Sequence, residues 1–192
     1  MNDLQLWKRL KSGDTNALKE IYKLYLGSLE GYSRKFTNET EIIEDAIHDL
    51  FIQIWNKKEN LSDTDSIIKY LCISLRRELI RRIEKSNKRT GIEYADINDI
   101  GFSLSIEDIL IQNEVDENNR IKLHQAFKLL SDRQREALYL KYYEEMTYEQ
   151  ICEIMDINYQ SVRNLISKGI IELRKFIILV ICYLSFALFF EI

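Results

Sequence analysis

The sequence of 192 residues contains no proline and only six glycines. Because proline interrupts helical hydrogen bonding and glycine weakens helix interiors, their scarcity allows long helices to run without a break. No stretch alternates apolar and polar residues over the length that a half-buried strand requires. Hydrophobic residues make up 46% and charged residues 30%, a balance typical of globular chains. The sequence therefore predicts an all-α fold of one or two compact domains.

Cysteine and histidine are also scarce. Cys72, Cys152 and Cys182 lie far apart, each in an apolar helical context, so we expect buried reduced thiols rather than disulfides. With His48 and His124 as the only histidines, no zinc cluster can be composed. We therefore expect no metal and no cofactor.

Sequence patterns of catalysis are missing. Glycine-rich phosphate loops, nucleophile elbows and His-x-x-x-His spacings do not occur. The carboxylate pairs Glu44-Asp45 and Glu107-Asp108 are adjacent, so their side chains point to different sides of a helix. We expect that the protein is not an enzyme.

Because residues 1–10 mix polar and apolar positions, no signal peptide is predicted and we expect a cytoplasmic protein.

Residues 130–175 have the pattern of three consecutive amphipathic helices, and the last two form a helix-turn-helix. Thr147 is the expected N-cap of a short helix over residues 148–155. A connection at residues 156–158 follows, and the second helix begins at Tyr159 and runs at least to Lys175.

The second of these helices has two distinct faces. At about 100° per residue, the apolar residues between Val162 and Leu173 share one side. The opposite side carries amides, hydroxyls and cations, namely Gln160, Ser161, Arg163, Asn164, Ser167 and Lys168. Such groups hydrogen-bond base edges in a major groove and the phosphates beside it. Periodicity alone leaves open the alternative of an ordinary surface helix with a solvated polar side.

The N-terminal half predicts four more helices. They cover residues 4–10, a segment that starts at the N-cap Asp14, residues 41–57 and a segment that begins at residues 65–66. The first half of the third helix has an acidic side, formed by Glu41, Glu44, Asp45 and Asp49.

The fourth helix carries six cations within one arc of about 140°, if it continues that far. They are Arg77, Arg81, Arg82, Lys85, Lys88 and Arg89. We call these six residues the cationic stripe. One-sided cations suit a DNA backbone, and the affinity should fall steeply with salt. The alternative is a solvated face, but Glu78 and Glu84 are the only nearby acids, so the usual i,i+4 compensation is mostly missing.

The sign of the charge reverses after the fourth helix. Residues 90–119 hold acids and no lysine or arginine. We therefore predict a domain over residues 1–89, an acidic linker over 90–104, a helix-turn-helix domain over 105–175 and a hydrophobic C-terminal helix over 176–192. Although the net charge of −4 argues against a general DNA-coating protein, its distribution allows two local DNA-binding surfaces.

The tail over residues 176–190 has no charge. As a helix it spans about 22 Å, short of the roughly 30 Å of bilayer hydrocarbon. We expect it to dock on another surface, with loose membrane contact as the alternative.

Residues 130–175 resemble region 4 of the ECF (extracytoplasmic-function) group of bacterial sigma factors. The matching residues are Leu130-Ser131, Arg133, Arg135, Tyr142-Tyr143, Thr147-Tyr148-Glu149-Gln150-Ile151 and Ser161-Val162-Arg163. Three positions depart from that pattern, with Ser131 in place of Pro, Cys152 in place of Ala and Asp156 in place of Gly.

Residues 4–89 resemble region 2 of the same group. The matching residues are Gly13-Asp14, Ala17, Tyr22, Tyr25, the run Glu44-Asp45-Ala46-Ile47-His48-Asp49-Leu50-Phe51, Trp55, Tyr70-Leu71 and Arg76. His48 stands where Gln is typical, and Arg77 and Arg81 replace Asn and Asp, which favours backbone grip over base recognition.

The resemblance implies a sigma factor that binds core RNA polymerase, through the β′ clamp and the β flap, and promoter DNA. Asp45, His48, Asp49 and Ile52 would dock on the clamp coiled coil, and the acidic side of the third helix would steer a basic partner helix. The cationic stripe would engage the −10 region, where Asn60, Leu61 and Ser62 would contact an everted base. The outer face of the second helix of the helix-turn-helix would engage the −35 element.

Two other classes of protein remain open at this stage. A stand-alone helix-turn-helix regulator would act as a symmetric dimer without being a polymerase subunit. The hypothesis of a membrane-bound helical adaptor is supported by the hydrophobic tail alone. An anti-sigma factor or another recruiting protein is a further expected partner of a sigma factor.

Overall fold

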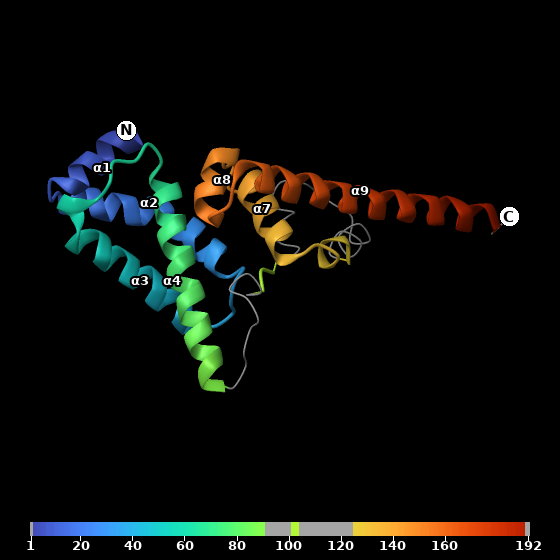
Figure 1. The fold of residues 1–192 in the computed structure, drawn as a ribbon, viewed down its shortest axis with the longest axis horizontal. Coiled ribbons are helices and arrows are strands. Elements are labelled where there is room, and N and C mark those ends of the chain that lie inside the picture. Colours follow the sequence, from blue (N-terminus) through green and yellow to red (C-terminus); the bar gives the residue numbers. More distant parts are fainter. Residues whose placement is uncertain (1, 91–100, 104–124, 191–192) are drawn as a thin grey trace. The chain divides into compact units, whose positions relative to one another are not determined.

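The computed structural model describes residues 2–90, 101–103 and 125–190, and the side chains up to residue 88 and within 101–103 and 125–175. Every regular element in these ranges is helical, which confirms the all-α prediction. The chain divides into two compact units, Met1–Gly101 and Phe102–Ile192 (Figure 1). All the acids of residues 90–119, and most of the predicted linker, lie outside the described residues.

The N-terminal unit is built from four α-helices and one turn of 3-10 helix. Their bounds are α1 Asp3–Lys11, α2 Thr15–Ser33, α3 Thr40–Asn56, η1 Lys58–Asn60 and α4 Ile67–Thr90. In Figure 1, α3 (teal) runs beside α4 (green), and α2 packs against both. The core between them is apolar and includes Trp7, Leu10, Ile43, Leu71 and Leu75.

Local capping fixes the start of two of these helices. The Asp14 carboxylate accepts hydrogen bonds from the backbone N–H groups of Asn16 and Ala17, which confirms the predicted N-cap of α2. Gly13 turns the chain just before it with φ of 90°, a backbone angle that favours glycine. Asp3 of α1 accepts from the backbone N–H of Ile67 at 2.8 Å and so ties the start of α4 to α1.

The C-terminal unit contains α7 Asp132–Tyr142, α8 Tyr148–Met155 and α9 Tyr159–Phe190. The short helix, the connection and the second helix lie where the sequence predicted a helix-turn-helix. Thr147 caps α8 in a capping box with Gln150, and Ser131 caps α7 in the same way with Gln134. The serine that replaces proline at residue 131 therefore starts α7 by a side-chain hydrogen bond.

The helix-turn-helix depends on one backbone turn and one close approach. Asp156, the C-cap of α8, has φ of 54° and lies in the left-handed region. Gly169 of α9 faces α7, and a Cβ added there would lie 2.9 Å from Leu138 Cδ1. Val162 and Ile166 of α9 are buried beside it, which confirms the predicted apolar face.

The helix α9 continues past Lys175 to Phe190, so the tail extends the second helix of the helix-turn-helix without a break. Over the residues that the structure describes, none of the helices is long and apolar enough to cross a bilayer. The side chains of the tail lie outside the described residues, so its docking stays a prediction.

We expect Asp156→Ala to lower the free energy of unfolding of the C-terminal unit by about 1 kcal/mol. Alanine has the Cβ that disfavours a left-handed backbone and lacks the short polar side chain that makes aspartate tolerable there. Asp156→Gly should leave the free energy of unfolding unchanged or raise it. Urea unfolding of both variants checks this, and equal losses in the two would contradict the assigned backbone strain.

Candidate functional site

The outer face of α9 presents most of the polar groups expected to meet DNA. Gln160, Arg163, Asn164, Ser167 and Lys168 are exposed, and Ser161 is half-buried. The opposite side of α9 packs in the core of the unit, so this face is rigidly supported. The side chains project from a helix preceded by a tight turn, the arrangement by which a recognition helix enters a major groove.

Two side-chain contacts order the start of this face. The Asn158 side chain accepts the backbone N–H of Ser161 at 2.8 Å and caps α9. Gln160 Nε2 donates to Asn164 Oδ1 at 3.0 Å, one helical turn further on. Each of the two side-chain amides can still form further hydrogen bonds, both as donor and as acceptor. Amides of this kind recognise adenine edges.

The helix α4 carries the cationic stripe, and it runs through all six positions to Thr90. Arg77, Arg81, Lys85 and Lys88 are exposed, whereas the side chain of Arg82 is only 19% exposed. The side chain of Arg89 lies outside the described residues. Four of the six cations therefore face solvent, and one is drawn inward.

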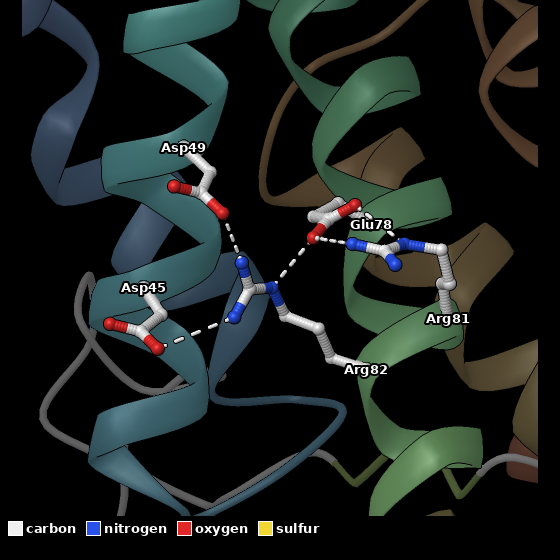
Figure 2. A network of polar contacts seen from close by, with 5 residues as sticks. All are labelled: Asp45, Asp49, Glu78, Arg81 and Arg82. Carbon is white, nitrogen blue, oxygen red and sulfur yellow. Dashed lines mark hydrogen bonds and ion pairs between the residues drawn. The ribbon is translucent and has the colours of Figure 1, made fainter.

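Arg82 is the centre of an ion-pair network between α3 and α4, as Figure 2 shows. Its Nε donates to Glu78 Oε1 at 2.6 Å, its Nη1 lies 3.4 Å from Asp45 Oδ2, and its Nη2 donates to Asp49 Oδ2. Glu78 also accepts from Arg81 Nη2 at 2.6 Å. Glu78 therefore compensates two of the six cations, Arg81 through an i,i+3 pair and Arg82 through an i,i+4 pair.

Glu78 is held in its charged form by this network. Burial raises the pKa of its carboxyl group, but the hydrogen bonds and positive charges of Arg81 and Arg82 outweigh burial, so the pKa lies below its ordinary value. Only 14% of the Glu78 side chain is exposed, so solvent screens these contacts weakly. The charged network therefore contributes to the packing of α3 against α4 at neutral pH.

The network joins two groups of residues that the sequence assigned to different partners. Asp45 and Asp49 were predicted to contact a basic protein helix, and Arg82 was predicted to contact DNA. Asp45, His48 and Ile52 lie on the exposed side of α3, and Asp49 is partly exposed. This surface combines acids with an apolar side chain that is 43% exposed, Ile52. We call these four residues the acidic face.

A shallow groove continues the network along α3 and α4. It has a volume of about 340 Å³ and is lined by Glu39, Glu41, Ile42, Asp45, Arg81, Arg82, Lys85 and Ser86. Three acids and three cations line it, so it offers no net charge to a small anion. Over the described part of the chain, no group of three or more His, Cys, Asp or Glu residues is placed to hold a metal ion.

The loop before α4 places two of its three candidate residues outward. Asn60 and Ser62 are exposed, and the Ser62 carbonyl accepts the indole N–H of Trp7 at 2.9 Å. Leu61 is buried in the core, so the apolar base contact expected of it is not available in this structure. The sequence could not predict which side of this loop faces the core.

Comparison with known protein families gives two matches. Sigma-70 region 2 matches residues 21–89 and sigma-70 region 4 matches residues 120–173. Together the two matches span more than half of the 192 residues. The first lies within the N-terminal unit and the second within the C-terminal unit.

Curated relatives agree with this result. The chain is 23% identical over 173 residues to the ECF RNA polymerase sigma factor SigK of Mycobacterium tuberculosis, covering 88% of this chain and 90% of that protein. It is 22% identical over 174 residues to SigK of Mycolicibacterium vanbaalenii, covering 88% and 86%.

Solved structures share the fold. The sigma factor RpoE from Bartonella quintana, in complex with the anti-sigma factor NepR, aligns with a TM-score of 0.60 at 19% identity, over 83% of this chain and 95% of that one. CnrH in complex with the cytosolic domain of CnrY aligns with a TM-score of 0.61 at 14% identity, over 91% and 96%.

We expect Arg82→Met to lower the free energy of unfolding of the N-terminal unit by about 1–2 kcal/mol at neutral pH, because three carboxylates lose a partly buried partner. The difference from the unchanged protein should shrink as the pH falls below about 4. A carboxyl group with a depressed pKa contributes stability above its ordinary pKa and loses it as protonation proceeds. Urea unfolding at several pH values measures this.

The matched control is Arg77→Met on the same helix, because Arg77 makes no ion pair with any residue that the structure describes. It should change the free energy of unfolding by less than about 0.5 kcal/mol. Equal losses in the two variants, or a loss in Arg82→Met that does not depend on pH, would contradict the stabilising role of the network.

Proposed function

The chain belongs to the sigma-70 family, in its ECF group, and from this premise we propose which residues serve each of its partners. It is a sigma factor, which binds core RNA polymerase and directs promoter recognition and transcription initiation. One observation carries this conclusion: both helical units match a sigma region, in the family's order. A stand-alone helix-turn-helix regulator would account for the C-terminal match but not for the match to region 2.

The acidic face is our candidate for the site that binds the β′ clamp of core polymerase. It projects from α3, whose other side is buried, so the partner meets a rigid surface. Asp45 and Asp49 would attract a basic helix, while His48 and Ile52 would add polar and apolar contact at the centre. Desolvation of Ile52 by the partner supplies affinity, and the acids supply orientation and association rate.

Binding of polymerase to the acidic face would require Arg82 to give up some of its ion pairs. In the free chain its guanidinium occupies the acids that a basic partner helix would approach. A cation from polymerase would compete with Arg82 for Asp49 and Asp45, and Glu78 would keep hold of Arg82 Nε. Binding of polymerase would therefore release one end of the Arg82 side chain, which could then contact DNA with the rest of the cationic stripe. We accordingly expect the free protein to have little affinity for promoters.

The cationic stripe is our candidate for the surface that engages the −10 region. Arg77, Arg81, Lys85 and Lys88 are exposed along α4, and Arg89 continues the series in sequence. Spaced along one helix, such cations neutralise successive phosphates and release counterions. Asn60 and Ser62, exposed just before α4, would contact an unpaired base by their amide and hydroxyl groups.

The outer face of α9 is our candidate for the surface that engages the −35 element, and the same C-terminal unit would meet the β flap. Gln160 and Asn164 would contact base edges near the start of the helix, with Arg163 and Ser161 beside them. Ser167 and Lys168, further along the helix, would contact phosphates.

Regulation by a protein partner is part of this proposal. The two structural neighbours were both solved with a bound protein, NepR or CnrY. We propose that this chain also meets an anti-sigma factor or a recruiting protein in the cytoplasm, and that its C-terminal tail docks on such a surface. Its role in transcription is regulatory, through binding rather than catalysis.

We expect Ile52→Glu to weaken binding to core polymerase at least tenfold, because it places a charge in the apolar centre of the contact. Run-off transcription with purified core enzyme and labelled promoter, together with co-elution of the two proteins, measures the effect. Transcription should require both proteins.

The matched control is Gln53→Glu, which adds the same charge at the next exposed position of α3 and should change core binding by less than about threefold. Arg82→Met should strengthen core binding at low salt, because the partner no longer displaces an internal cation. Tight, sequence-specific promoter binding by this chain without core, or equal losses in the two glutamate variants, would refute the assignment.

We expect Lys168→Ala to weaken promoter binding by the holoenzyme uniformly across upstream sequences and to reduce the slope of log affinity against log salt by about 1. Arg163→Ala should instead reduce discrimination among upstream sequences by about 1–3 kcal/mol if it contacts a base edge.

Filter binding over a salt series, with promoters that differ only in the upstream element, separates the two effects. Lys128→Ala is the control, since Lys128 is exposed in the same unit and lies outside the helix-turn-helix in sequence. If Lys128→Ala changes the salt slope as much as Lys168→Ala, the effect reflects total charge and the assignment of α9 fails.

A further inference from the structure

The loop before α4, residues 60–66, is held against α1 by contacts that the proposed function does not use. The indole Nε1 of Trp7, a fully buried side chain, donates to the Ser62 carbonyl at 2.9 Å. At the next residue, Lys11 Nζ donates to Asp63 Oδ1 at 2.5 Å. In Figure 1, α1 (blue) lies beside this loop, which leads into α4 (green). Two side chains of α1 therefore fix adjacent residues of the loop.

The point where the loop enters α4 is fixed as well. Asp3 Oδ2 accepts the backbone N–H of Ile67, the first residue of α4, at 2.8 Å. The other oxygen of the same carboxylate accepts the hydroxyl of Tyr25 on α2 at 2.9 Å. The ring of Trp7 lies 4.8 Å from the ring of Tyr70 in the first turn of α4. The helix α1 thus joins the loop to the helix that carries the cationic stripe.

The contacts within the loop leave two polar side chains for an outside partner. Leu61 has an extended backbone and is buried, so the next side chain, that of Ser62, points outward. Thr64 is buried, and its hydroxyl bonds to both the carbonyl and the N–H of Ser66. Among the described residues, the exposed side chains of Asn60 and Ser62 have no hydrogen-bond partner. These are the two side chains assigned to the unpaired base.

We propose that α1 positions this loop for recognition of the unpaired base, with Trp7 and Lys11 as positioning residues. Both act through the loop and not on DNA: the indole fixes the direction of the Ser62 backbone, and the ion pair restricts Asp63. A loop that is ordered in advance loses less conformational entropy when a base binds. It also presents its polar groups in one geometry, which increases the preference for one base over another.

This inference rests on the proposed function, which places Asn60 and Ser62 at the base. A purely structural role of α1 would have a different consequence. If α1 only stabilised the unit, its loss would lower the fraction of folded protein and reduce transcription from all promoters by the same factor. A positioning role instead changes the ratio between promoters that differ in the base that the loop contacts. The ratio therefore separates the two roles.

The first test measures core-dependent transcription from promoters that carry each of the four base pairs at each position of the −10 element. The position read by the loop is the one at which the double variant Asn60→Ala, Ser62→Ala changes the preference between bases. Trp7→Phe removes the indole donor and keeps an aromatic ring in the core. It should reduce the preference at that position about three- to tenfold, the effect of one hydrogen bond, and leave the other positions unchanged. Added to the double alanine variant, Trp7→Phe should have no further effect on the ratio.

The matched control is Ile43→Val, a buried substitution at the end of α3 that lies away from the loop in sequence. It removes one buried methyl group and so lowers the stability of the same unit. It should leave every ratio between bases unchanged. If Trp7→Phe, like Ile43→Val, lowers transcription from every promoter by the same factor, the inference is overturned.

A second test uses the exposed ion pair and needs no change in the core. Lys11→Glu places two acids together, and Asp63→Lys places two cations together. Each change alone should reduce the preference at the position read by the loop about two- to fourfold, because exposed pairs contribute less than buried hydrogen bonds. The two changes combined recreate a pair of opposite charges and should restore the preference. Losses that simply add in the combined variant would overturn the role of the pair.

The outcomes separate this inference from the proposed function. If the double alanine variant changes the preference at one position but Trp7→Phe and the ion-pair variants do not, the positioning role is wrong while the assignment of the loop stands. If the double alanine variant changes no preference, the loop contacts no base, and the inference fails with that assignment. If the unchanged protein supports no core-dependent transcription, the proposed function itself is wrong.

Discussion

The contact between Arg82 and the acids of α3 and α4 is the constraint on which the N-terminal unit depends. It lies at the junction where these two helices pack, and it balances charges that would otherwise repel along each helix. Because Glu78 is largely buried, its charge requires partners in the folded chain, and Arg81 and Arg82 supply them. The same contact occupies part of each predicted binding surface. The stability of the unit and its partner binding therefore draw on the same side chains.

Much of the fold follows from local sequence, and the reasons are visible in single residues. Asp14 and Thr147 cap helices because their side-chain oxygens accept from backbone groups two or three residues away, so their role is local. The exposed side of α9 follows from helical periodicity alone, and its predicted DNA-facing residues lie there in the structure. The pair Glu78–Arg82 was also within reach of the sequence, since the two are four residues apart.

The contacts that the sequence could not predict join distant segments. The bonds from Arg82 to Asp45 and Asp49 depend on which sides of α3 and α4 meet, and no periodicity states this. Arg135 Nε donates to the carbonyl of Phe102, 33 residues earlier, and the phenylalanine stands in a stretch without a helical pattern. The burial of Leu61 is a similar case, since a loop residue has no periodic neighbour to indicate its side. Each miss concerns tertiary pairing and not the identity of an element.

The departures at Arg77 and Arg81 change how the proposed −10 surface would recognise DNA. Amide and carboxylate side chains recognise bases, whereas guanidinium groups on an exposed helix mainly contact phosphates. Arg81 is in addition engaged by Glu78, which fixes its direction along α4. A −10 surface of this kind holds DNA firmly but discriminates sequences weakly. Under the proposed assignment, most of the sequence discrimination comes from the outer face of α9.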